Sequence, residues 1–225
     1  MNDTTTTLAI GHRTIPLDPP RPPRKPDMLL WIDTETTGVD PYQCELLEVG
    51  MQVTDMTGKH PHDSLHLIVH PDNIRNWANY PELLKAYEMH LANGLMLACA
   101  EAPKTGYDYK HTALNIHEFL NDQLSQYTLH PAGTNVDFDL RFLENEFRLA
   151  QFPFRVPGRL CTQQLAKAHL PGPKRTLAVC CEQAGVVNEH AHSARGDTLA
   201  TAELFRFFLR QHPAGVPWTE VRAAA

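Results

Sequence analysis

Two acidic residues, Asp33 and Glu35, end an apolar stretch that reads LLWIDTETTGVDP from Leu29 to Pro41. Alternate residues of a strand point to the same side, so both carboxylates are expected on one face of a sheet. Like charges at that separation repel, and each raises the cost of ionising the other. A cation between them would remove this repulsion, so the stretch predicts a metal site where a strand ends.

Two later segments carry acidic residues at the start of predicted helices. Asn135-Val-Asp-Phe-Asp139 follows a strand and opens a helix, so Asp139 falls in a first helical turn, where the helix dipole favours a carboxylate. His192-Ser-Ala-Arg-Gly-Asp197 enters the last helix, with His192 in the preceding loop. Each segment alone has a structural alternative. Asp137 and Asp139 suit a plain helix start, and a serine N-cap suits the second segment.

The order of the three segments is more specific than any one of them. A strand-borne Asp-x-Glu comes first, then a helix-start Asp with Asn four residues before it, then a loop His five residues before an Asp. Together they resemble the histidine-bearing branch of the DEDD exonuclease superfamily, which has the ribonuclease H-like fold. The resemblance spans about residues 28–211. It implies a 3′–5′ exonuclease, a hydrolase that releases 5′-monophosphates from the 3′ ends of single-stranded DNA or RNA or of short oligonucleotides.

The chemistry of phosphodiester hydrolysis explains these residue types. Two divalent ions about 4 Å apart can generate the attacking hydroxide and stabilise charge on the leaving oxygen. Hard ions such as Mg²⁺ or Mn²⁺ prefer carboxylate oxygens to thiolates. We expect Asp33 to bridge the two ions, with Glu35, Asp139 and Asp197 completing their coordination, partly through water. His192 is expected to accept the proton of the nucleophilic water as general base.

The resemblance also implies a set of nucleotide-binding residues. They are Thr36, Thr37, Gly38, His90, Asn135 and Phe138. Residues 36–38 are expected to form a turn beneath the terminal nucleotide, where small residues let the backbone approach the sugar. His90 belongs to a segment, MHLANGL, that is similar to one in oligoribonucleases. For Phe138 a position in the core is the alternative to stacking on a base.

The motifs combine features of two subfamilies. LLWIDTETTGVDP is similar to oligoribonuclease, although that family has Met where this chain has Thr36, and one more residue between Asn135 and Asp139. The sequence NVDFD resembles the proofreading exonuclease and ribonuclease T, and HSARGDTLATAELF resembles the last motif of ribonuclease T. The preference between DNA and RNA and the substrate length therefore stay open.

An α/β fold must position these residues. Apolar runs predict strands at 28–34, 45–55 and 64–70, joined as an antiparallel meander, and further strands at 128–134 and 159–162. Helical patterns cover 81–98, 110–126, a segment from about Asp137, 163–169, 174–184 and 194–211. The prediction is a ribonuclease H-like mixed sheet, an antiparallel three-strand meander plus parallel strands, flanked by helices.

Composition sets the domain limits and the environment. Residues 1–27 predict a Pro/Thr-rich flexible or polyproline arm, 28–212 the exonuclease domain, and 213–225 a C-terminal tail. No apolar run predicts a membrane span or a secretory signal, and five cysteines without a CxxC pair are typical of a cytoplasmic protein. The net charge of −6 argues against a duplex-coating protein. A homodimer is expected by analogy with the resembling families.

Three alternatives accompany this prediction. His60, His62, His66 and His70 have a spacing that suggests zinc, although a strand would spread them along its length. A degenerate nuclease fold could act as a non-catalytic binding module, but all five residues of the expected catalytic set are present. An endonuclease of the same fold is the third alternative, and cleavage of a circular strand would support it.

Overall fold

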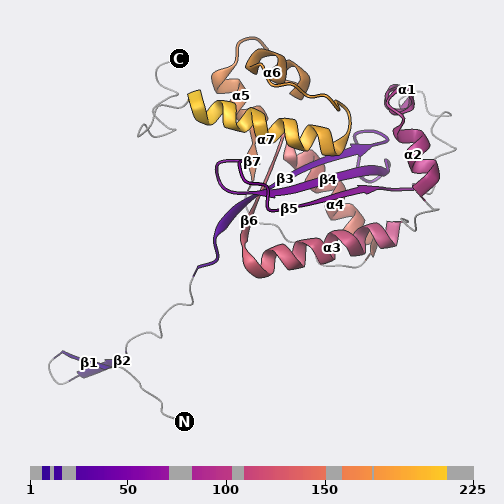
Figure 1. Ribbon diagram of the computed structural model, residues 1–225. Coiled ribbons are helices and arrows are strands. Elements are labelled where there is room, and N and C mark those ends of the chain that lie inside the picture. Colours follow the sequence, from indigo (N-terminus) through magenta and orange to yellow (C-terminus); the bar gives the residue numbers. More distant parts are fainter. Residues whose placement is uncertain are drawn as a thin grey trace.

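A mixed β-sheet lies between two layers of helices (Figure 1). The computed structural model describes residues 7–10, 13–16, 24–70, 83–102, 109–150, 159–173 and 175–211. In these ranges the main sheet has five strands in the order β5-β4-β3-β6-β7. They are β3 (Asp27–Thr36), β4 (Leu46–Thr54), β5 (Asp63–Ile68), β6 (Thr128–Gly133) and β7 (Leu160–Cys161). Strands β3, β4 and β5 are antiparallel, and β6 and β7 continue the sheet in parallel, so the predicted meander and mixed sheet are confirmed.

Seven helices accompany these strands within the described ranges. They are α1 (Leu84–Ala92), α2 (Leu95–Glu101), α3 (Tyr109–Gln126), α4 (Val136–Ala150), α5 (Thr162–His169), α6 (Leu177–Ala184) and α7 (Ala194–Gln211). The helical pattern predicted over 81–98 forms two helices, because the chain turns at Gly94, whose φ of 84° separates α1 from α2. Helix α6 begins later than predicted, after the N-cap Thr176. None of the helices in the described part of the chain is both long and apolar enough to cross a membrane.

The two faces of strand β3 pack against different helices. Leu30 and Ile32 belong to a core that includes residues of α3 and α4. Leu29 and Trp31 pack instead with Ala202 and Phe205 of α7. Side chains of a strand alternate between its faces, so Asp33 and Glu35 continue the row formed by Leu29 and Trp31. The acidic pair therefore faces the α7 side of the sheet.

The N-terminal region contains an element that the sequence did not predict. Strands β1 (Thr7–Ile10) and β2 (Arg13–Pro16) pair antiparallel, whereas residues 1–27 predict a flexible or polyproline arm. The paired segments, TLAI and RTIP, are rich in threonine and isoleucine, which have high strand propensity. Strand β3 begins at Asp27, next to the predicted start of the exonuclease domain at Met28, and the predicted C-terminal tail, 213–225, lies outside the described residues.

Candidate active site

The acidic pair lies where strand β3 extends past its parallel neighbour. Strand β6 pairs with β3 only as far as Trp31, so the following residues of β3 have no strand on that side. The first turn of α4 occupies this place. Asp139 of α4 is buried, and its Oδ1 accepts hydrogen bonds from the backbone N–H of Thr34 at 2.9 Å and from its hydroxyl at 2.8 Å. The predicted third carboxylate is therefore fixed beside the strand that carries Asp33 and Glu35.

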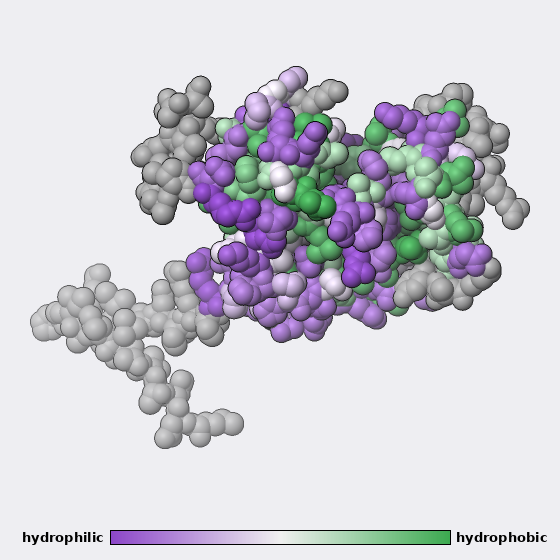
Figure 2. Space-filling model, turned by 45° about the horizontal axis from the view of Figure 1, so that its top comes forward, coloured by the Kyte–Doolittle hydropathy of each residue, from purple (hydrophilic) through white to green (hydrophobic). Residues whose placement is uncertain are grey.

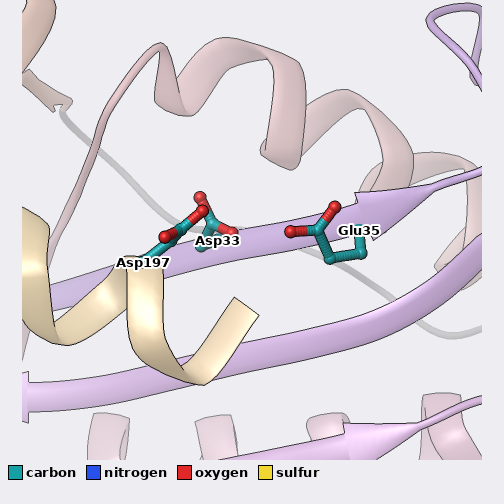
Figure 3. A group of neighbouring side chains, drawn as sticks. All are labelled: Asp33, Glu35 and Asp197. Atoms are coloured by element: carbon teal, nitrogen blue, oxygen red, sulfur yellow. The ribbon is translucent and has the colours of Figure 1, made fainter. Parts of the chain in front are cut away.

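A fourth carboxylate, that of Asp197, reaches the acidic pair from α7. Ligand oxygens of Asp33, Glu35 and Asp197 all lie within 4.8 Å of one another (Figure 3). Asp33 and Glu35 project from β3 towards the first turns of α7, which carry Asp197. Helix α7 comes this close because residue 50 of β4 is glycine. A Cβ at Gly50 would lie 2.5 Å from the carbonyl oxygen of Ala194, where α7 begins.

Burial and mutual repulsion make this group of carboxylates hard to ionise. Burial, followed by the charge of Asp139, raises the pKa of Asp33 well above its ordinary value. Burial and then Asp197 raise the pKa of Glu35 to about 8. Burial raises the pKa of Asp139 to about 7, against the effect of its hydrogen bonds from Thr34. Bound cations would relieve this cost directly, since an opposite charge favours the ionised form.

Asp197 has additional partners that favour its ionised form. Burial raises its pKa, but the side-chain amide of Asn188 donates a hydrogen bond to its Oδ1 at 2.5 Å. His192 lowers the same pKa by its charge and by a hydrogen bond from its backbone N–H. The sequence did not single out Asn188. Its only signal is a polar residue in the connection between α6 and α7.

The chemistry of the donor set fits a hard divalent cation. In the described part of the chain, Asp33, Glu35 and Asp197 are the one group of three or more potential ligand residues that converge. All their donor atoms are carboxylate oxygens, which suit Mg²⁺ or Mn²⁺. The four-histidine alternative fails geometrically. His66 Nε2 lies 2.6 Å from a carboxylate oxygen of Glu48, whereas His70 Nδ1 lies 3.0 Å from the carbonyl oxygen of Cys99.

His192 lies in the turn that leads into α7, as predicted. Its side chain is exposed, and its backbone has a φ of 62°, in the left-handed region. Its carbonyl oxygen accepts a hydrogen bond from the side-chain amide of Asn93 at 2.6 Å. The exposed side chain lies near enough to Asp197 for its charge to act on that carboxylate, so His192 stays a candidate general base.

The turn over residues 36–38 forms beside the carboxylates. The Thr36 hydroxyl donates to the carbonyl oxygen of Gly38 at 2.6 Å, and the backbone N–H of Thr37 donates to the carbonyl oxygen of Glu45 at 2.9 Å. Gly38 allows two neighbours to approach. A Cβ there would lie 2.7 Å from Cys44 Sγ and 2.8 Å from Leu83 Cδ2. The packing of the turn thus gives a structural reason for a small residue at Gly38.

His90 is buried beneath the turn at residues 36–38. Its ring is only 1% exposed, and Nε2 donates to the carbonyl oxygen of Thr36 at 3.0 Å, so it supports the turn from beneath. Its Nδ1 has no hydrogen-bond partner, and burial lowers its pKa. Nucleotide binding by His90 stays a prediction. Any effect of His90 on a nucleotide would pass through the turn.

The two remaining predicted nucleotide-binding residues differ in exposure. Asn135 is exposed, has a φ of 61°, and accepts a hydrogen bond from the backbone N–H of Phe138 at 2.8 Å. Phe138 is half-buried and packs against the α4 side of the core, with its ring centroid 5.0 Å from that of Phe142. The alternative of a core role for Phe138 is therefore favoured by its contacts.

Glu48 is a functional candidate that the sequence did not suggest. It is 3% exposed and lies directly opposite Glu35 in the β3–β4 register. Its charge raises the pKa of Asp33, Glu35 and Asp197. The available signal was a lone acid inside an apolar run, LLEVGMQV, which predicts a buried carboxylate.

Comparison with known proteins identifies the class. Residues 30–205 match the model of the exonuclease family, and the chain belongs to that family. It is 28% identical over 184 residues to the DNA polymerase III subunit epsilon of Rickettsia prowazekii, a match that covers 77% of this chain and 70% of the relative. The corresponding subunit of Rickettsia typhi is 29% identical over 185 residues, with the same coverage.

Solved structures of exonuclease I have a similar fold. An Escherichia coli exonuclease I in complex with a dA16 oligonucleotide matches with a TM-score of 0.64 and 19% identity, covering 83% of this chain and 42% of that one. Exonuclease I from Methylocaldum szegediense matches with a TM-score of 0.63 and 21% identity over 83% of this chain and 41% of the other. The chain thus spans less than half the length of these proteins. The ribonuclease H-like fold predicted from the sequence is confirmed.

Proposed function

We propose that this chain is a metal-dependent 3′–5′ exonuclease that acts on single-stranded nucleic acid and releases 5′-monophosphates. The observation that carries the proposal is the convergence of Asp33, Glu35 and Asp197 within 4.8 Å, in a chain of the exonuclease family. Asp139 beside Thr34 and the exposed His192 complete the expected set. The predicted domain, residues 28–212, contains the whole family match.

The expected catalytic residues have two roles: the carboxylates bind metal ions, and the histidine accepts a proton. Asp33, Glu35, Asp139 and Asp197 would hold two ions of Mg²⁺ or Mn²⁺. When bound, these ions supply activation of water and stabilisation of charge on the leaving oxygen. His192 accepts the proton of the attacking water at a ring nitrogen and passes it to solvent, to which its side chain is exposed. The turn at residues 36–38 places the backbone beside the terminal sugar.

DNA is the first substrate to test. The curated relatives are DNA polymerase III epsilon subunits, and two of the exonuclease I structures are complexes with DNA oligonucleotides, dA16 and dT13. Because the chain's net charge is −6, we expect a short footprint near the metal site rather than broad electrostatic binding. The homodimer expected from the resemblance stays a prediction, which light scattering on the purified chain would check.

Two other functions predict different outcomes when the chain is incubated with single strands. A non-catalytic binding module would retain single strands without shortening them in any metal. An endonuclease of the same fold would cut a circular single strand, which an exonuclease cannot enter. The intact set of four carboxylates and a histidine supports catalysis.

Labelled oligonucleotides test the proposal. A 5′-labelled single strand should give a descending ladder in Mg²⁺ or Mn²⁺ and no product in EDTA, and a 3′-labelled strand should release its label first. A blocked 3′ end and a circular strand should both resist. The same assay on DNA and on RNA strands, from dinucleotides to 30-mers, measures the preference of the enzyme for one sugar and for a strand length. Degradation that requires a free 5′ end, or cleavage of the circle, would overturn the assigned direction.

A further inference from the structure

The backbone at His192 needs outside support. Its φ of 62° lies in the left-handed region, which a residue with a Cβ seldom adopts and which persists only where surrounding contacts enforce it. The side chain is exposed, so packing of the ring does not supply that support. One contact comes from within the same motif, because the backbone N–H of His192 donates to Asp197. Two further contacts come from distant parts of the chain.

The first distant contact comes from the corner between α1 and α2. Asn93 is the C-cap of α1, and its side-chain amide makes two hydrogen bonds. Its Oδ1 accepts from the backbone N–H of Leu95 at 3.0 Å, which supports the start of α2. Its Nδ2 donates to the carbonyl oxygen of His192 at 2.6 Å. The amide oxygen of Asn93 thus supports the turn between α1 and α2, and the amide nitrogen holds the backbone of His192.

The second distant contact comes from strand β4. The hydroxyl of Ser193 donates to Oε1 of Glu48 at 3.1 Å. The same oxygen lies 2.6 Å from Nε2 of His66 on β5, so Glu48 is oriented from two sides. The residue that follows His192 is therefore tied to the buried floor of the site, while the carbonyl of His192 itself is tied to the α1–α2 corner.

We propose that Asn93 and Glu48 are positioning residues that hold the imidazole of His192 at the reacting water. The inference rests on the proposed function, in which His192 is the general base. The same α1–α2 segment supports the nucleotide turn, since His90 of α1 donates to the carbonyl oxygen of Thr36. One corner of the fold thus sets the turn beneath the substrate and the turn that carries the base. Figure 2 shows the face on which the α5–α7 part and the α1–α2 part rise on either side of an indentation.

Asn93 allows the positioning role to be separated from the structural one. In Asn93→Asp a carboxylate oxygen can still accept from Leu95, but no N–H remains to donate to His192. Asn93→Ser likewise keeps an acceptor for the helix start and is too short to reach the histidine, and it adds no charge. We expect both variants to lower kcat about threefold to tenfold, the range that one hydrogen bond supplies. KM should stay unchanged in Asn93→Ser, and its unfolding midpoint should fall no more than that of a variant that loses a comparable side-chain hydrogen bond elsewhere.

Matched controls for the two tested residues come from α3. Asn115→Ala removes a side-chain amide that donates to the carbonyl of His111 within α3, and it should leave kcat unchanged. Ser193→Ala tests the bond to Glu48 and should lower kcat by a similar factor to Asn93→Ser. Ser125→Ala, which removes a hydroxyl that bonds the carbonyl of Asp122, is its control.

A double-mutant cycle decides whether Asn93 acts through His192. In a His192→Ala background, Asn93→Ser should have no further effect on the residual rate, since the group that it positions is gone. Amide hydrogen exchange on the metal-free protein gives a readout independent of activity. The segment at residues 190–193 should exchange faster in Asn93→Ser and at the wild-type rate in Asn115→Ala. Equal rate losses in both backgrounds, or unchanged exchange, would overturn the inference.

The proposed function fails in a different way from this inference. If wild type shortens no strand, or if His192→Ala is as active as wild type, the assignment of the general base is wrong. If wild type is active and His192→Ala is impaired while Asn93→Asp and Asn93→Ser match wild type, only the positioning role is wrong.

Discussion

The metal-free protein should lose stability as the pH rises. Burial raises the pKa of Glu35 from 4.5 to about 8 and that of Asp139 from 3.8 to about 7. For each group the pKa in the unfolded chain is the lower one. Between the two values the folded state keeps a proton that the unfolded state has released, so the free energy of unfolding falls with increasing pH. The full contribution is present below about pH 4 and is lost as the pH passes through the folded pKa.

The size of the effect follows from the linkage relation. Each group that keeps its proton only in the folded state lowers the free energy of unfolding by about 1.4 kcal/mol per pH unit. For a chain of 225 residues, this corresponds to about 3–6 °C in Tm for each group and pH unit. Mg²⁺ should reverse the trend, because a bound cation stabilises the ionised carboxylates. The gain in Tm on adding Mg²⁺ should therefore be larger at pH 8 than at pH 5.5.

Thermal unfolding by circular dichroism, from pH 5.5 to 8 in EDTA or in Mg²⁺, measures both effects. Glu35→Gln should flatten the slope in EDTA, because one of the titrating groups is gone. Glu118→Gln, on the exposed surface of α3, is the matched control and should keep the wild-type slope. A Tm in EDTA that is constant or rises up to pH 8, with an Mg²⁺ effect that does not depend on pH, would show that these carboxyl groups do not keep their protons in the folded state.

Two substitutions test how the site is assembled. His192→Ala should lower kcat by about 10²–10⁴-fold while Mn²⁺ still binds, and His190→Ala should be nearly normal, as steady-state kinetics and Mn²⁺ titration would reveal. The opposite result would move the general base to His190 and put Asp197 in doubt. Gly50→Ala should force α7 away from β4, lower the free energy of unfolding by about 1–3 kcal/mol and reduce kcat. Wild-type values in a denaturant titration and in the kinetic assay would contradict this packing.

The parts of the site that lie close together in the sequence could be predicted from it. Asp33 and Glu35 share a face because strand geometry fixes the alternation of side chains. The place of Asp197 in the first turn of α7 could be predicted because the start of that helix lies only a few residues before it in the sequence. The meander was predictable because its strands are consecutive and their connections are short.

The parts that depend on contacts between distant segments could not be predicted. Asn93 contacts the carbonyl of His192 across 99 residues, and nothing in either local sequence indicates the other. Glu48 looked like one residue of an apolar strand, because its partners come from β5 and from the turn before α7. His90 was assigned to the nucleotide, but its burial depends on how α1 packs beneath the turn. The break between α1 and α2 depends on the left-handed backbone at Gly94, which periodicity does not detect.

The most direct test is a Mg²⁺ titration of nucleoside 5′-monophosphate release from a single-stranded oligonucleotide, with wild type and Asp33→Asn side by side. Asparagine has nearly the size of aspartate but lacks the charge expected to bridge two ions. We expect the wild-type rate to rise to saturation with Mg²⁺ and to be absent in EDTA. Asp33→Asn should stay below about one hundredth of that rate at every concentration. Release of 5′-monophosphates in EDTA, or a wild-type rate from Asp33→Asn, would contradict a metal-dependent mechanism centred on Asp33.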